Sequence, residues 1–392
     1  MVPNGWRQES LGSLFEFKNG LNTEKDQYGS GYKFVNVMDV FKNDILTESK
    51  IIGRVQVTDS QLEGYQIKYG DVLFNRTSET FDEIAMTAVY LDDAIATFGG
   101  FVIRGRPTGE DILSNYSPFL FQSKNYRSQA IKLGQGAVRA NIGQKDLSKV
   151  LVLLPPLPEQ KKIAKILSTW DKAITTTEQL LANSQQQKKA LMQQLLISKK
   201  RLLDKHGVRF SGEWKHGHLS DLGKITKGKA LSSKDLIDGN YPVIAGGKSS
   251  PYNHRDYTNE NVITVSASGA YAGYVAYHPY KLWASDCSVV IAKANADITF
   301  IYQLMSHMQM KIYSLQSGGA QPHVYPKDLE VLRISIPPIE EQQKIAAVLC
   351  TADQEIAALK NKLYALKQEK KALMQQLLTG KRRVKIDNKE VA

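Results

Sequence analysis

One segment occurs twice in the chain, and this duplication constrains the fold more than any other feature. Lys188 to Leu196, KKALMQQLL, recurs without change as Lys370 to Leu378. Residues 154–202 and 336–384 align at an offset of 182 positions without a gap. Chance does not produce such a match, so the chain consists of two related halves.

Each copy begins with a Pro-Pro pair, Pro155-Pro156 or Pro337-Pro338. Because proline can neither continue a strand ladder nor sit inside a helix, the pair marks the end of an extended segment. Beyond it, apolar residues recur in alternating steps of three and four, the period of a coiled-coil seam. The predicted seam residues are Ile163, Leu167, Trp170, Ile174, Leu181, Leu191 and Leu195, and then Ile345, Leu349, Ala352, Ile356, Leu359, Leu363, Leu366, Leu373 and Leu377.

A few polar residues interrupt the seam: Thr177, Ser184 and Lys188 in the first copy, and Lys370 in the second. About 44 helical residues at about 1.5 Å each predict a rod of about 66 Å. If a globular unit lies at each end of the rod, the second helix must run back along the first. The helices are then antiparallel, the halves are related by a pseudo-two-fold axis, and the termini lie close together.

We therefore expect an α/β protein with two globular α/β domains separated by two long helices that form an antiparallel coiled coil. The predicted segments are a first globular domain (1–153), a central helix (154–205), a second globular domain (206–335), and a C-terminal helix with a basic tail (336–392).

The net charge of +12 is concentrated in the two copies. Residues 159–205 and 341–385 each hold ten basic and four acidic side chains, and the rest holds 31 of each. A lysine-rich helix face is as easily explained by solvation as by DNA binding. Any DNA-binding face of the neutral globular units must be locally polarised, with acidic residues turned away.

The composition, 42% hydrophobic and 23% charged residues, is typical of a soluble protein. The sequence has no apolar run long enough to span a membrane and no signal peptide. Cys287 and Cys350 are far apart and lack metal-ligand spacing. We expect a protein of the reducing cytoplasm.

No catalytic motif is complete. Gly247-Lys248-Ser249 resembles the end of a phosphate-binding loop, but the first glycine of that motif is replaced by Pro242. Gly134-x-Gly136 starts a dinucleotide fingerprint, but Arg139 stands at its third glycine. His206, His216 and His218 are better explained as solvated residues of a polar connector than as metal ligands. The chain is predicted not to be an enzyme and to hold no metal.

Both globular halves combine a polar loop that follows a strand with a glycine-rich loop that precedes Lys-Asp-Leu. Arginine, asparagine and glutamine make paired contacts to base edges, so these loops supply the candidate DNA contacts. For any single residue, a side chain that merely faces water is the more frequent case. The candidates are Arg76, Ser78, Arg139 and Asn141 in the first unit, and Lys248, Tyr271, Gln321 and His323 in the second.

The duplicated pattern apolar-Pro-Pro-apolar-x-Glu-Gln-x-Lys-Ile-Ala, followed by a heptad helix, resembles the helical regions of type I restriction-modification specificity subunits. The Gly-Asp-x-Leu-Phe strand at 70–74 resembles their target-recognition domains. The resemblance covers essentially the whole chain. It implies a non-catalytic subunit in which each domain reads one half of a split, asymmetric DNA site and the helices fix the separation.

The same resemblance implies partners. Two methylation subunits would bind S-adenosylmethionine and methylate an adenine in each half-site, and translocase-nuclease subunits would use ATP and Mg. The first unit, 6–153, is longer than the second, 214–335, so the half-sites are expected to differ. Two alternatives remain open at this point. One is a coiled-coil adaptor that binds proteins and does not read DNA, and the other is an enzyme with an unrecognised site.

Overall fold

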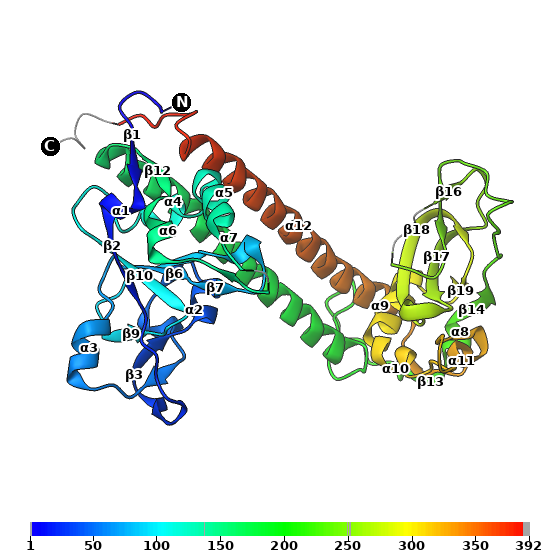
Figure 1. Ribbon diagram of the computed structural model, residues 1–392. Helices are drawn as coiled ribbons and strands as arrows, with labels where there is room; N and C mark the ends of the chain where they lie inside the picture. Colours follow the sequence, from blue (N-terminus) through cyan, green and yellow to red (C-terminus); the bar gives the residue numbers. More distant parts are fainter. Residues whose placement is uncertain (1, 137, 249, 251, 387–392) are drawn as a thin grey trace. The chain divides into compact units, whose positions relative to one another are not determined.

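The computed structural model describes residues 2–136, 138–248, 250 and 252–386. The chain forms two compact units, Met1–Thr176 with Leu363–Ala392, and Thr177–Lys362 (Figure 1). Each unit is described by itself. The predicted basic tail lies partly outside the described residues, as do Ala137 of the first glycine-rich loop and Ser249.

A five-stranded sheet of order β2-β10-β6-β8-β4 forms the centre of the first unit. Its pairs are antiparallel except β4 with β8. Smaller sheets are β1-β12, β7-β11 and β5-β3-β9. The strands are β1 (Arg7–Ser10), β2 (Phe15–Asn19), β3 (Tyr28–Val35), β4 (Ile45–Leu46), β5 (Arg54–Val55), β6 (Val72–Asn75), β7 (Thr77–Ser78), β8 (Thr87–Tyr90), β9 (Ala96–Phe98), β10 (Val102–Pro107), β11 (Ala140–Asn141) and β12 (Leu151–Leu154).

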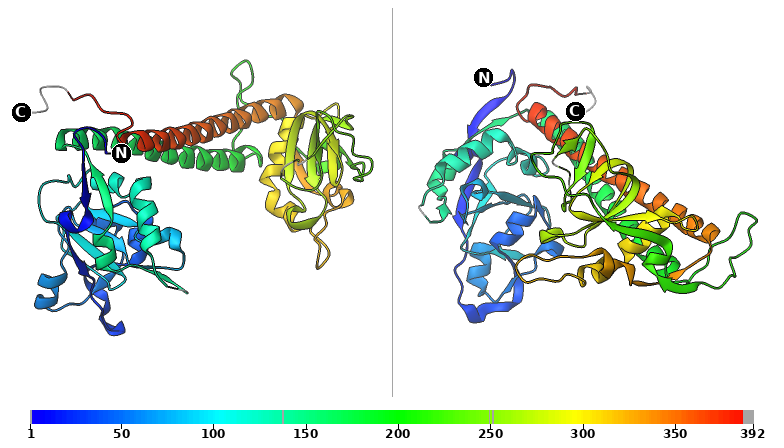
Figure 2. Two further views of the ribbon diagram at one scale, coloured as in Figure 1. Left: turned by 45° about the horizontal axis from the view of Figure 1, so that its top comes forward. Right: turned by 90° about the vertical axis from the view of Figure 1, so that its right-hand side faces the viewer.

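Short helices cover this sheet (Figure 2). Phe74 of β6 meets Phe121 edge to face at 5.2 Å, and Phe121 meets Tyr126 at 5.0 Å, so an aromatic cluster joins sheet and helices. Ser123 caps α5 by accepting a hydrogen bond from the Tyr126 amide. The helices are α1 (Leu11–Leu14), α2 (Val37–Lys42), α3 (Asp59–Tyr65), α4 (Ser117–Leu120), α5 (Lys124–Leu133) and α6 (Gln144–Ser148).

The second unit repeats this plan. Its sheet has the order β14-β19-β17-β18-β15-β16, and β15 runs parallel to β18, as β4 does to β8. No counterpart of the three-stranded sheet is found among its described residues. The strands are β13 (Lys215–His218), β14 (Gly223–Lys227), β15 (Tyr241–Ile244), β16 (Asn253–His254), β17 (Asn259–Ser266), β18 (Val275–Ala284), β19 (Cys287–Ala292) and β20 (Arg333–Ile336), and the helices are α8 (Leu219–Leu222), α9 (Ile298–His307), α10 (Gln309–Tyr313) and α11 (Pro326–Glu330).

The two copies of the repeat form the long helices α7 (Leu157–Leu195) and α12 (Ile339–Leu377), each preceded by its Pro-Pro pair. Within the first unit, Lys370 of α12 pairs with Asp171 of α7. Within the second, Lys188 of α7 pairs with Asp353 of α12 at 2.6 Å. In each unit, a residue in the later part of one helix pairs with a residue in the earlier part of the other. The two helices therefore run antiparallel, as predicted.

Every predicted seam residue is buried or half-buried. Two of the polar residues that interrupt the seam, Thr177 and Ser184, are also buried. Ser184 Oγ donates a hydrogen bond to Glu355 Oε1 over 3.0 Å. Each helix has 39 residues, not the expected 44, and is therefore about 58 Å long. The helical period ends after Leu195 and Leu377, where the chain turns to contact the start of the other helix.

The structure corrects one further expectation. His216 and His218 lie in strand β13, not in a connector, because residues 215–218 pair with β20. Strand β8 begins at Thr87, because Ala85 adopts a positive φ of 51° and turns the chain before it. Among the described residues, no helix is both long and apolar enough to span a membrane.

Candidate nucleic-acid interface

The structure brings the polar loop and the glycine-rich loop of the first unit together. Part of each forms a strand, and β7 pairs antiparallel with β11, so that Thr77 lies opposite Asn141. Thr77 Oγ1 donates to Asn141 Oδ1 over 2.8 Å, and the Ile142 amide donates to the Arg76 carbonyl over 3.0 Å. All four candidates of this unit therefore belong to one surface feature, which we call the first loop pair (residues 75–79 and 134–141).

Within the first loop pair, Arg139 is the exposed cation. Gly136 has a φ of +121°, and a Cβ there would lie 2.1 Å from the Arg139 carbonyl oxygen, so only glycine permits this loop path. The other three candidates are held more tightly. Arg76 is half-buried, and its Nη1 donates to the Gly100 carbonyl. Ser78 is buried, and its Oγ donates to Glu83 Oε2 over 2.8 Å. Asn141 Nδ2 donates to the Arg139 carbonyl.

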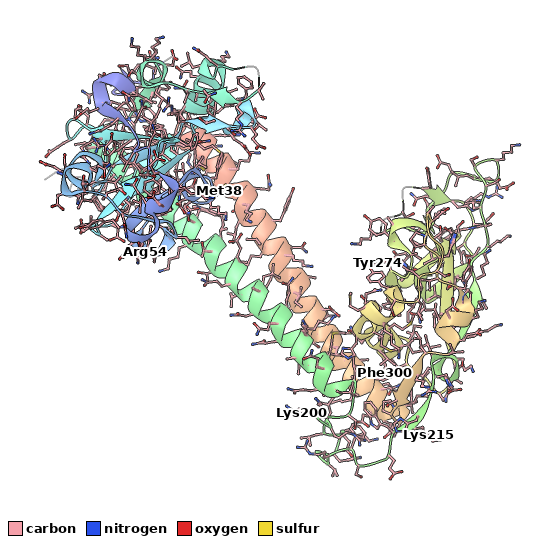
Figure 3. The ribbon with its side chains drawn as sticks, turned by 60° about the horizontal axis from the view of Figure 1, so that its bottom comes forward. Met38, Arg54, Lys200, Lys215, Tyr274 and Phe300 are labelled. Carbon is pink, nitrogen blue, oxygen red and sulfur yellow. The ribbon has the colours of Figure 1, made fainter. Side chains whose placement is uncertain are left out.

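A pocket of about 800 Å³ adjoins Arg139 and the polar loop. Met38 from α2 (Figure 3) and Phe101 before β10 line it and are 53% and 64% exposed. Three carboxylates also line it, Glu79, Asp82 and Glu83. This differs from the expectation that acidic residues are turned away from such a face. No local sequence signal indicated Met38 or Phe101, because only the tertiary fold places them beside the loops.

The second unit has an equivalent second loop pair (residues 266–271 and 317–323). Ser268 bridges to His323, and the Gly269 amide donates to the Pro322 carbonyl over 3.1 Å. His323 is half-buried and closes its own loop by exchanging backbone hydrogen bonds with Ser317. Gln321 is exposed beside it. In both units, the turn after a central strand is thus hydrogen-bonded to a glycine-rich loop.

Lys248 reaches the second loop pair from a separate segment. Its Nζ lies 5.2 Å from the ring centroid of Tyr271 and 5.5 Å from that of Tyr274 (Figure 3), so the ammonium group rests on two aromatic faces. Ser266 Oγ donates to the Gly246 carbonyl over 2.7 Å and ties this segment to the sheet. The sequence indicated Tyr271 but missed Tyr274, whose role depends on the fold around Lys248.

The side chains gathered at the two loop pairs suit recognition. Lysine or arginine, tyrosine and amide side chains are groups that contact phosphates and base edges. In the part of the chain that the structure describes, no group of three His, Cys, Asp or Glu side chains is arranged to hold a metal ion.

Comparison with known proteins assigns the family. The family model of the type I restriction modification DNA specificity domain matches residues 3–183 and again residues 211–368. The chain belongs to this family. This chain is 27% identical to the putative type I restriction enzyme MjaX specificity subunit of Methanocaldococcus jannaschii, over 98% of this chain and 95% of that relative. It is 26% identical to the EcoKI specificity subunit of Escherichia coli K12 over 38% of the chain and 33% of that relative.

The fold of the specificity subunit also has a counterpart among solved structures. The type I restriction-modification system S subunit from M. genitalium superposes with a TM-score of 0.66, at 16% identity, over 96% of this chain and 98% of that one. The predicted fold class is thereby confirmed. The chain is a DNA sequence-specificity subunit of a restriction-modification complex and not itself an enzyme.

Proposed function

We propose that each unit of the specificity subunit reads one half of a bipartite, asymmetric DNA site. The observation that carries this proposal is the recurrence of the loop pair on the same strand framework, with different side chains in the two units. Arg139 and Asn141 stand where the second unit has Gln321 and His323. Because base edges are distinguished by the side chains that meet them, different loops read different half-sites.

The lengths of α7 and α12 set the spacer between the half-sites in this proposal. Both helices have 39 residues, and their pairing is fixed by a Lys–Asp ion pair in each unit. A rigid helix advances about 1.5 Å per residue, so removing a heptad shortens it by about 10 Å. That change corresponds to about three base pairs at the 3.4 Å rise of duplex DNA.

The partners follow from the same role. We propose that the subunit assembles in the cytoplasm with two adenine-methylation subunits and with translocase-nuclease subunits. S-adenosylmethionine acts in the methylation partner, because the target adenine must be flipped into a methyltransferase pocket. ATP and Mg act in the translocase-nuclease partner. The relatives named as specificity subunits of type I restriction enzymes support this assembly.

A selection on randomised split sites tests the reading of DNA. The assembled complex with the methylation partner is incubated with duplexes that carry two random blocks and a variable spacer. Wild-type protein should recover two separate motifs. Deleting one heptad from both helices should change the preferred spacer and leave both motifs recognisable. A single continuous motif, or no sequence preference, would contradict the proposal.

Salt dependence separates DNA reading from a role as a protein adaptor. Contacts to phosphates release bound cations, so the logarithm of the association constant should fall linearly with the logarithm of salt concentration. The affinity measured by fluorescence anisotropy at several salt concentrations gives this slope. A slope near zero would favour the adaptor.

A further inference from the structure

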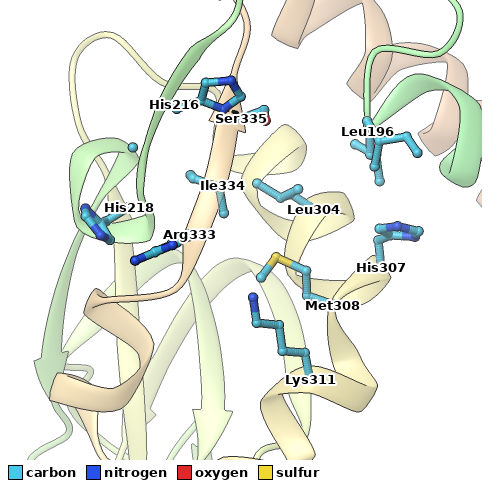
Figure 4. Close-up of a pocket in the computed structure, with 12 residues that line it drawn as sticks. Leu196, His216, His218, Leu304, His307, Met308, Lys311, Arg333, Ile334 and Ser335 are labelled. Atoms are coloured by element: carbon cyan, nitrogen blue, oxygen red, sulfur yellow. Dashed lines mark hydrogen bonds between the residues drawn. The ribbon is translucent and has the colours of Figure 1, made fainter.

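The second unit contains a pocket of about 760 Å³ between strand β20 and helices α9 and α10 (Figure 4). Apolar side chains such as Leu304, Met308 and Ile334 form part of its lining. Two cations, Lys311 and Arg333, also line it, together with the imidazole rings of His216, His218 and His307. Among the lining residues, all of which the structure describes, there is no aspartate or glutamate. The pocket is therefore apolar in part and complementary to negative charge.

Strand β20 presents a free backbone edge to this pocket. β20 pairs with β13 on one side only, and the Leu219 amide donates to the Leu332 carbonyl at the start of the ladder. Because hydrogen-bonded and non-hydrogen-bonded pairs alternate in an antiparallel ladder, Arg333 and Ser335 direct their N–H and C=O groups away from β13. Within the described part of the chain, no hydrogen bond to these groups of Arg333 is found.

In the first unit, the equivalent edge has a partner. Leu151 of β12 stands at the position equivalent to Arg333, in the same kind of ladder with β1. There, Gln129 of α5 closes the edge: the Leu151 amide donates to Gln129 Oε1 over 3.0 Å, and Gln129 Nε2 donates to the Leu151 carbonyl over 2.8 Å. Asn125 Nδ2 adds a third bond to that carbonyl. In the second unit, an open pocket takes the place of this glutamine.

We propose that this pocket binds an extended, acidic segment of a partner protein, which adds a strand to the free edge of β20. Backbone groups of the segment would pair with Arg333 and Ser335, as in other cases of strand addition. Alternate side chains would then face the basic residues and the apolar lining. The inference is independent of half-site reading, because none of the eight candidate DNA contacts lines the pocket.

A peptide is favoured over DNA for a chemical reason. A sheet edge offers alternating donors and acceptors at peptide spacing, and another polypeptide backbone matches this alternation along its whole length. The phosphates of DNA accept hydrogen bonds but donate none. The partly apolar lining also suits aliphatic side chains better than a hydrated phosphate backbone.

The test uses the full chain and a fluorescein-labelled peptide of about ten residues that alternates glutamate and valine. Fluorescence anisotropy should show saturable binding, and a lysine–valine peptide of the same length should bind at least about tenfold more weakly. The glutamate–valine peptide with N-methyl groups on alternate amides should lose binding, because it cannot pair with the edge. Absence of binding by the glutamate–valine peptide at about 1 mM would overturn the proposal.

Matched variants locate the site. Ser335→Pro removes the outward N–H but no bond to β13, and it should weaken binding, whereas Ser335→Ala keeps the N–H and should not. The double variant Lys311→Glu with Arg333→Glu should raise the Kd at least about tenfold, and Lys224→Glu, outside the pocket, should leave it unchanged. Unchanged peptide binding in the double variant would overturn the proposal. So would a loss of duplex DNA binding without loss of peptide binding, which would make this a nucleic-acid surface.

Discussion

Arg383 forms a two-pronged ion pair with Glu159, a residue that precedes it by 224 positions in the chain. Its Nε donates to Glu159 Oε2 over 2.9 Å, and Trp6 Nε1 donates to the same oxygen over 3.3 Å. Glu159 lies in the first turn of α7 and is buried. One carboxylate thus joins the start of α7, the segment after α12 and the tryptophan that opens the first unit.

The second unit repeats this contact with equivalent residues. Arg201, which follows α7, donates to Glu341 in the first turn of α12 over 2.6 and 2.7 Å. Trp214 Nε1 donates to Glu341 Oε2 over 3.0 Å. Each helix start is therefore fixed to the segment that leaves the other helix.

Removing the carboxylate charge of Glu341 should destabilise the second unit. Glu341→Gln leaves the partly buried Arg201 guanidinium without its charge partner, which should lower the free energy of unfolding by about 2 kcal/mol. Urea denaturation followed by circular dichroism measures the change. The neighbouring Glu340 is exposed, so Glu340→Gln is the control and should change stability little. Equal effects of the two substitutions would contradict the structural role of Glu341.

A charge in the helical seam should destabilise the paired helices. Leu363 is a half-buried seam residue, and Leu363→Asp should cost about 2 kcal/mol because an ionised carboxylate is placed between apolar side chains. Tyr364, the next residue, is 68% exposed, and Tyr364→Asp should be nearly neutral. Thermal denaturation of both variants makes the comparison, and a wild-type melting temperature for Leu363→Asp would be inconsistent with the coiled coil.

His278 should make the stability of the second unit depend on pH. Burial lowers the pKa of His278 from its ordinary value of 6.5 to about 4. Its Nε2 lies 2.8 Å from Thr264 Oγ1 and its Nδ1 lies 3.0 Å from the Tyr280 hydroxyl. Because the unfolded chain takes up a proton on this residue near pH 6.5 and the folded chain does not, stability should fall as the pH is lowered from about 6.5 to about 4.

The magnitude of this effect is about 3 kcal/mol across that window, since one pKa unit corresponds to about 1.4 kcal/mol. Urea denaturation at several pH values should show a steeper loss for wild type than for His278→Gln, which carries no titratable group. All other titrating groups are common to both proteins. Parallel curves for the two proteins would show that His278 does not titrate with this lowered pKa.

Damage to one loop pair should affect one half-site only. Arg139→Ala removes an exposed cation from the first loop pair and should weaken discrimination at one half-site by about 1–3 kcal/mol per lost base contact. Lys248→Ala should act on the other half-site. Selection on randomised split sites measures both. If Arg139 contacts only phosphate, affinity should fall evenly for all sequences and the salt slope should decrease by about one.

The purified chain should show no methyltransferase, nuclease or ATPase activity by itself. This expectation follows from the incomplete catalytic motifs and from the family. Methyl transfer from labelled S-adenosylmethionine to DNA should appear only when the methylation partner is added. The control is a mock purification from cells that lack the gene. Turnover by the chain alone above that background would contradict the assignment.

The sequence alone determined the helical framework. The steps of four and three from Ile345 to Leu349 and on to Ala352 are a local property, so they predict which face of a helix is buried without knowledge of the partner. The Pro-Pro pairs fixed where each helix starts, because proline excludes a continuing strand. The duplication itself implied two equivalent halves.

Only the tertiary structure decided how the functional surfaces are assembled. The pocket beside Arg139 includes Met38 and Phe101, which come from distant segments and carry no pattern in the sequence. Whether the edge of β20 is open depends on whether a neighbouring helix supplies a side chain, as α5 supplies Gln129 in the first unit. The spacing of residues along the sequence does not indicate this. Predicting a hydrogen bond or a pocket requires atomic positions in three dimensions. Predicting which face of a helix is buried requires only the spacing of apolar residues along the chain.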